Sequence, residues 1–116
     1  MAHLNMLEAA VLREMCKQVP EDAVALGLQI DEAVVVSRDN TGAGFYSNLK
    51  VVGAAGSVKS KIIANVFARI DGLKNPMSFA LFIKEGVINV LEGAAVDDST
   101  VGLDFSKVKF RLSSGG

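Results

Sequence analysis

The stretch MSFALFIKEGVINVLE, residues 77–92, decides the predicted fold of this chain. Residues 77–84 and 87–92 are two apolar runs of strand length, and Glu85-Gly86 separates them. A glycine can adopt the positive φ that a tight hairpin turn requires, so Gly86 is suited to the connection. The stretch therefore predicts two antiparallel strands joined by a short turn.

A second predicted hairpin precedes this one in the chain. Residues 33–37 are β-branched and apolar, and residues 38–42 form a cluster of turn-forming residues. Residues 43–52 then alternate apolar and polar side chains, as a half-buried strand does. We expect a small-residue loop at 53–57 to follow.

Two further strands are expected, at 61–71 and at 105–112. Residues 61–71 alternate as a strand would, but their apolar residues also fit the stripe of an amphipathic helix. The β-branched content and the turn at 72–76 favour the strand. In the last segment, alternation points Phe110 inward and Lys109 outward, and residues 113–116 are expected to fray.

The N-terminal segment is expected to be helical. Leu4, Leu7, Val11 and Met15 follow one another at steps of three, four and four residues, which predicts an amphipathic helix over residues 4–18. Pro20 ends this helix and suits the start of a second one over residues 21–28.

One or two helices followed by five or six strands predict a single α+β domain, residues 1–116. Short turns between neighbouring strands indicate a largely antiparallel, meander-like sheet with the helical segment on one face.

Composition excludes several classes of protein. The chain has 116 residues, half of them hydrophobic, with 12 basic and 13 acidic side chains. This balance does not support nucleic-acid binding by a basic field. No apolar run approaches the roughly 20 residues of a membrane span, and no basic segment of a signal peptide is present at the start. We therefore expect a cytoplasmic protein that binds neither membrane nor nucleic acid.

The usual catalytic and metal-binding groups are scarce. His3 is the only histidine and Cys16 the only cysteine, so a Ser-His triad, a cysteine-based metal cage and an intrachain disulfide are not expected. Residues 53–60 approach a phosphate-binding loop, but Val58 stands where that motif needs a glycine. We expect no cofactor and no metal, and favour a protein that is not an enzyme.

The predicted strands carry apolar side chains on both faces, although the first helix can cover only one. A second helix with loops, a cavity for an apolar ligand, or a second protein surface could provide the other cover. We favour self-association as a homodimer, with an unknown protein partner as an addition. The expected association surface consists of Ile63, Phe67, Phe82, Ile88 and Val90.

An alternative is a small-molecule binding domain or minor enzyme with a pocket near Arg38, Tyr46 and Glu92. Glu92 stands at the end of an apolar strand. There it could be exposed, paired with Arg38 or Arg69, or used to anchor a ligand.

Several segments together resemble a group of small bacterial proteins that share a G-x-G-F-[FY] segment, an I-x-G-L turn and an LF-x-x-x-G…LEG hairpin. The matching pieces lie between residues 33 and 112: Gly42 to Tyr46, Ile70 to Leu73, Leu81 to Gly86, and Leu91 to Gly93. Ala94-Ala95-Val96 stand where that group has aromatic residues. The resemblance favours a strand at 61–71 and implies no activity.

Overall fold

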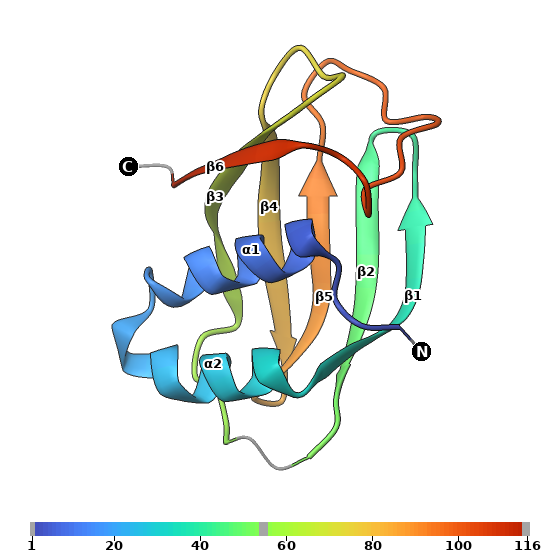
Figure 1. The fold of residues 1–116 in the computed structure, drawn as a ribbon. Coiled ribbons are helices and arrows are strands. Elements are labelled where there is room, and N and C mark those ends of the chain that lie inside the picture. Colours follow the sequence, from blue (N-terminus) through green and yellow to red (C-terminus); the bar gives the residue numbers. More distant parts are fainter. Residues whose placement is uncertain (1, 54–55, 115–116) are drawn as a thin grey trace.

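The computed structural model describes residues 2–53 and 56–114, and places two helices before a sheet of six strands (Figure 1). The α+β class predicted from the sequence is confirmed, including the second helix and the strand at 61–71. The elements are α1 (Met6–Cys16), η1 (Pro20–Asp22), α2 (Ala23–Asp31), β1 (Ala33–Asn40), β2 (Gly44–Val51), β3 (Ile62–Ile70), β4 (Met77–Lys84), β5 (Val87–Ala94) and β6 (Phe110–Ser114).

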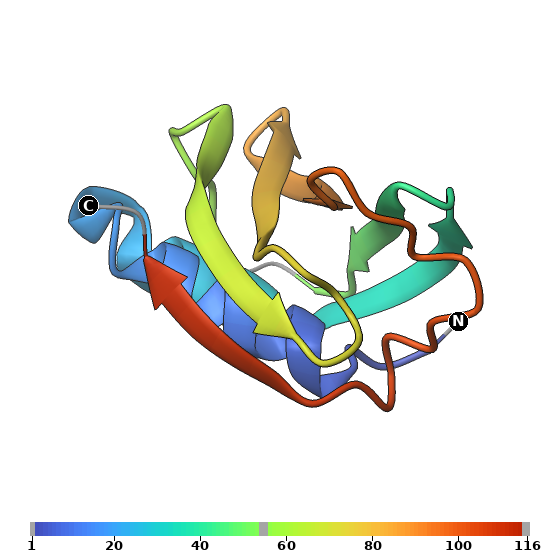
Figure 2. The same cartoon turned by 90° about the horizontal axis from the view of Figure 1, so that it is seen from above.

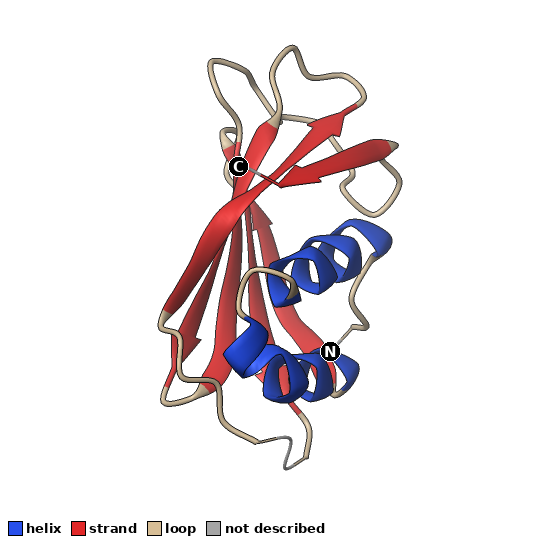
Figure 3. Ribbon diagram, turned by 90° about the vertical axis from the view of Figure 1, so that its left-hand side faces the viewer, coloured by secondary structure: helices blue, strands red, loops and turns tan. Residues whose placement is uncertain are grey.

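The sheet is antiparallel throughout, in the order β1-β2-β5-β4-β3-β6. It therefore departs from a simple meander, because β5 rather than β3 lies beside β2. Both helices pack on one side of the sheet (Figure 3). Seen from above, the two edge strands curve toward that side (Figure 2). The overall extents of 38 × 33 × 20 Å fit one helical layer on one sheet.

Helix α1 supplies the cover that its apolar stripe predicts. Leu7, Val11 and Met15 are at most 1% exposed and pack on the sheet. The helix starts two residues later than Leu4, because the side chain of Asn5 accepts a hydrogen bond from the backbone N–H of Glu8 while Glu8 accepts one from the N–H of Asn5. This reciprocal capping box defines the first turn.

Three register shifts interrupt the strand pairing, in β1 between Val35 and Ser37, in β3 and in β5. Those in β3 and β5 change the face of residues expected on the association surface. In β3 the pairing with β4 shifts between Ile63 and Val66, and Asn65 there has a φ of 66°. Both flanking residues are consequently buried, although strict alternation would put them on opposite faces. The prediction that Ile63 lies on the association surface is therefore wrong.

The second bulge lies in β5, where Ile88 pairs with Ile83 and Val90 pairs with Phe82, so that Asn89 is the extra residue. Ile88 and Leu91 both point into the core, and Ile88 is only 1% exposed. The expected place of Ile88 on the association surface is corrected for the same physical reason.

The ends of several elements differ from the sequence prediction. Helix α1 ends at Cys16 instead of residue 18, and α2 covers Ala23–Asp31 instead of residues 21–28. β1 continues to Asn40 through the expected turn, because pairing with β2 extends to Asn40 opposite Phe45. The last strand begins only at Phe110, and residues 105–109 form turns and loop. Within the expected loop at 53–57, residues 54–55 lie outside the described residues.

Two of the motif segments meet in the sheet. Phe45 of the G-x-G-F segment pairs with Gly93 of the LEG segment on β5. A Cβ atom at Gly93 would lie 2.6 Å from Cε2 of Phe45, 2.9 Å from Cε1 of Phe79 and 3.0 Å from Cε of Met77. A glycine is needed at this position because core side chains fill the space over its Cα atom.

Gly93→Ala should lower the free energy of unfolding by about 1–3 kcal/mol, because the added methyl group overpacks the core. Gly27→Ala in α2 is the control, since its Cβ would meet only the flexible Arg13 side chain at 3.8 Å. Alanine should stabilise that helix by roughly 0.5–1 kcal/mol. Urea denaturation followed by circular dichroism measures both. Equal effects of the two substitutions would contradict the steric role of Gly93.

Candidate functional site

The face of the sheet opposite the helices, called the open face below, has no described helix against it (Figure 3). Phe82 lies on this face two residues before the end of β4, and it pairs with Val90 on β5 and with Ile62 on β3. Phe82 and Val90 are half-buried by their neighbours, and Ile62 is 60% exposed. These three residues form the apolar row of the open face.

Phe67 lies farther along the same face of β3, where it pairs with Ser78 and is half-buried. Of the five residues expected to form an association surface, the structure therefore brings Phe67, Phe82 and Val90 to the open face. Large side chains with no described cover on a sheet face are typical of a contact surface.

Tyr46 and Glu92 also lie on the open face, one step from the apolar row. Tyr46 pairs with Glu92 on one side and with Asp39 on the other. The negative charge of Glu92 and a hydrogen bond to that carboxylate raise the pKa of the Tyr46 phenol, with a smaller contribution from Asp39. Asp39, Tyr46 and Glu92 form the acidic row of the open face.

Lysines lie on the opposite side of the apolar row. Lys84 is two residues from Phe82 on β4 and pairs with Val87. Lys50 is two residues beyond Asn48 on β2, and Asn48 pairs with Val90. Both lysines are exposed. Lys50 and Lys84 form the basic row.

Arg38 lies on the helix side of the sheet, because it is opposite the fully buried Ser47 and reaches α1. Its Nε donates to Oε2 of Glu8 at 2.9 Å and its Nη2 donates to Oε1 at 2.7 Å. The Ser47 hydroxyl also donates to Glu8, and Nη2 of Arg38 donates to the carbonyl of His3 at 2.9 Å. The guanidinium thus binds a carboxylate of the same chain in bidentate fashion.

Glu8 is a buried carboxylate with 1% of its surface exposed. Burial by itself would raise the pKa of Glu8, but hydrogen bonds from Arg38, Ser47 and the N–H of Asn5 outweigh burial and lower it. The same pairing raises the pKa of Arg38. Glu8 is therefore ionised at neutral pH, and its charge is balanced inside the fold.

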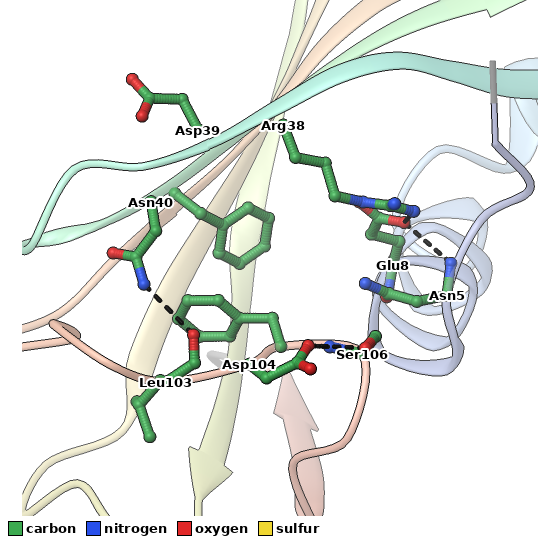
Figure 4. Close-up of a pocket in the computed structure, with 10 residues that line it drawn as sticks. Asn5, Glu8, Arg38, Asp39, Asn40, Leu103, Asp104 and Ser106 are labelled. Carbon is green, nitrogen blue, oxygen red and sulfur yellow. Dashed lines mark hydrogen bonds and ion pairs between the residues drawn. The ribbon is translucent and has the colours of Figure 1, made fainter.

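A pocket of about 380 Å³ adjoins this ion pair (Figure 4). The rings of Phe45 and Phe105, with centroids 4.7 Å apart, line this pocket together with Arg38 and Glu8. Ser106 donates to Asp104 at the rim. The lining residues are Asn5, Glu8, Arg38, Asp39, Asn40, Phe45, Leu103, Asp104, Phe105 and Ser106.

Tyr46 and Glu92 do not line this pocket, because the sheet separates them from Arg38. Ser47 and Leu91 are fully buried on the helix side, so their strand neighbours Tyr46 and Glu92 point to the open face. The three residues expected to surround one ligand pocket therefore lie on two faces of the sheet. Arg38 has an internal partner, and that partner is Glu8.

The sequence analysis did not identify Glu8 and Ser47 as partners of Arg38. The spacing Asn5-x-x-Glu8 is a recognisable capping box and could have marked the helix start. The contact of Glu8 with Arg38 and Ser47 joins residues 30 and 39 positions apart, which no local pattern reveals.

Comparison of the chain with protein-family models, with curated proteins and with solved structures finds no match. The resemblance to a group of small bacterial proteins therefore stays a prediction. Neither of the described α-helices, with 11 and 9 residues, is long enough to cross a membrane.

Arg38→Ala should lower the free energy of unfolding at neutral pH by about 3 kcal/mol, because it leaves the Glu8 carboxylate buried without a counter-charge. Arg13→Ala is the matched control. Arg13 pairs with Asp31 at the surface, where the side chains are 50% and 58% exposed, and its loss should cost about 0.5 kcal/mol or less. Urea denaturation measures both variants. Similar losses would contradict a structural role specific to Arg38.

Glu8 should also make the free energy of unfolding depend on pH in the acidic range. Because folding lowers its pKa from the ordinary value of 4.5, its contribution is complete above pH 4.5 and is lost as the pH falls through the lower folded value. Glu8→Gln removes this titration. The difference in unfolding free energy between wild type and Glu8→Gln should shrink between about pH 5 and pH 3 in urea titrations. A difference independent of pH would contradict this assignment.

Proposed function

We propose that this protein acts without catalysis, by associating with a second copy of itself through the open face of its sheet. The observation that carries the proposal is the apolar row of Ile62, Phe82 and Val90 on a face where no described element packs, with Phe67 farther along the same face. Packing a second sheet against such a face removes this apolar surface from water.

The size of the open face supports a stable contact. The strands β1 to β5 have eight or nine residues each. With about 4.8 Å between strands and about 3.4 Å per residue, they span a flat area on the order of 650 Å². This value lies at the lower end of the roughly 600–1,000 Å² per partner that standard-size interfaces bury. A cytoplasmic location and an additional protein partner belong to the same proposal.

A ligand-binding function receives less support. It rested on Arg38, Tyr46 and Glu92 around one pocket, and only Arg38 lines the pocket described above. The side chain of Arg38 already binds Glu8. We therefore do not propose a ligand pocket formed by Arg38, Tyr46 and Glu92 together.

Phe82→Glu should convert a dimer into a monomer, because it places a charge at the centre of the apolar contact. Val24→Glu is the control, since Val24 on α2 is 79% exposed and lies on the helix side. Sedimentation velocity at tens of micromolar should show dimers for wild type and Val24→Glu and a monomer for Phe82→Glu. Circular dichroism checks that both variants fold.

Two outcomes would overturn the proposal. One is a monomeric wild type at tens of micromolar. The other is a folded Phe82→Glu variant that still dimerises as the wild type does.

A further inference from the structure

The open face carries its charges in a regular arrangement about the apolar row. On β5, Glu92 is two residues from Val90, and on β4, Lys84 is two residues from Phe82 in the opposite direction along the sheet. On β2, Tyr46 and Lys50 flank Asn48 in the same way. Two residues along a strand correspond to about 6.8 Å. The acidic and basic rows therefore lie at equal distances on either side of the apolar row.

Resting on the proposed function, we infer that the two copies pack with a two-fold axis along the apolar row, perpendicular to the strands. Rotation about this axis turns the second sheet over, so that its acidic row lies on the side where the first copy has its basic row. Each acidic row then faces the basic row of the other copy, while Phe82, Val90 and Ile62 meet their own equivalents. Because the interface is two-fold symmetric, each contact between an acidic and a basic row occurs twice, whereas a contact between equivalent residues on the axis occurs once.

The alternative axis, parallel to the strands, gives the opposite electrostatics. Rotation about this axis places the acidic row of one copy against the acidic row of the other, so that Asp39 and Glu92 face carboxylates of the partner. The two basic rows likewise face each other, so that Lys50 faces lysines. Like charges facing each other are unfavourable, whereas complementary charges determine the register of an interface. The charge pattern thus favours the axis along the apolar row over the axis parallel to the strands.

Two other charged residues do not alter this choice. Arg69 and Arg111 pair with each other across β3 and β6, and both are exposed. Phe67 pairs with Ser78, four residues from Phe82 on β4, and Arg69 lies farther still. Because β4 ends at Lys84, only two residues beyond Phe82, rotation about the proposed axis carries both side chains past the partner's rows. These two arginines therefore lie outside the predicted charge contacts.

Charge-reversal variants test the orientation. Asp39→Lys/Glu92→Lys makes both rows basic, and Lys50→Glu/Lys84→Glu makes both rows acidic. Each variant alone should form a homodimer at least about ten-fold weaker than wild type at low salt, because like rows face each other. Mixed in equal amounts, the two variants should form a heterodimer, since the basic rows of one now face the acidic rows of the other.

Native mass spectrometry of the mixture, with one variant labelled by ¹⁵N, gives the proportions of homodimer and heterodimer. Sedimentation velocity gives the strength of each complex. The control is Glu21→Lys/Asp71→Lys, which makes the same change in net charge as Asp39→Lys/Glu92→Lys at exposed residues outside the three rows. This control should dimerise as wild type does. Raising the salt concentration to about 1 M should make the dimer dissociation constants of all variants more similar, because salt screens exposed charges.

The outcomes separate this inference from the proposed function. If Phe82→Glu abolishes the dimer but the homodimers of the two reversal variants are as strong as wild type, the open face is the interface and the inferred axis is wrong, because like rows already face each other about the alternative axis. The heterodimer is favourable about either axis. Its absence would show that the charged rows do not meet across the interface, which overturns the inferred axis as well. If wild type is a monomer, both the proposed function and the inferred axis fail.

Discussion

The buried pair of Glu8 and Arg38 is the interaction on which the arrangement of the molecule depends. Glu8 closes the first turn of α1, and the same carboxylate accepts hydrogen bonds from Arg38 on β1 and Ser47 on β2. One side chain thus joins the helix to two neighbouring strands. Removing a carboxylate from water is costly unless charged donors surround it, so the helix start and these strands take one relative position. That position puts α1 against one face of the sheet, and α2 packs on the same side.

A sheet with both helices on one side has an open face, and the bulges in β3 and β5 help to decide which residues it carries. Without the irregularities beside Ile63 and at Asn89, strict alternation along β3 and β5 would place some core residues of these strands on the open face. With them, Ile63 and Ile88 complete the core, while Phe67 and Val90 stay on the open face. The apolar row and the charged rows beside it therefore result from backbone register as much as from composition. This explains how a small domain with a balanced charge can combine a complete core with a second, ordered apolar surface.

Much of the fold could be predicted from local sequence. The stripe of α1, the hairpin at 77–92 and the strand at 62–70 follow from periodicity and turn residues, and Phe67, Phe82 and Val90 were assigned to the correct face. The errors have physical causes. A bulge is a one-residue insertion whose position depends on the partner strand, so Ile63 and Ile88 were placed on the wrong face. The late start of β6 at Phe110 depends on pairing with β3, which is 40 residues earlier at Ile70.

The sequence by itself determined which segments form helices and strands and in what order, because these depend on neighbours within a few residues. It also showed that the strands carry more apolar side chains than one face covered by helices can bury. Only the tertiary structure decided which partner each polar group has. Arg38 was expected beside Tyr46 and Glu92, and instead binds Glu8 through the core side of the sheet. It also decided the alignment of Glu92, Val90 and Lys84 into separate rows, since a row across a sheet exists only when strands from different parts of the chain pair in register.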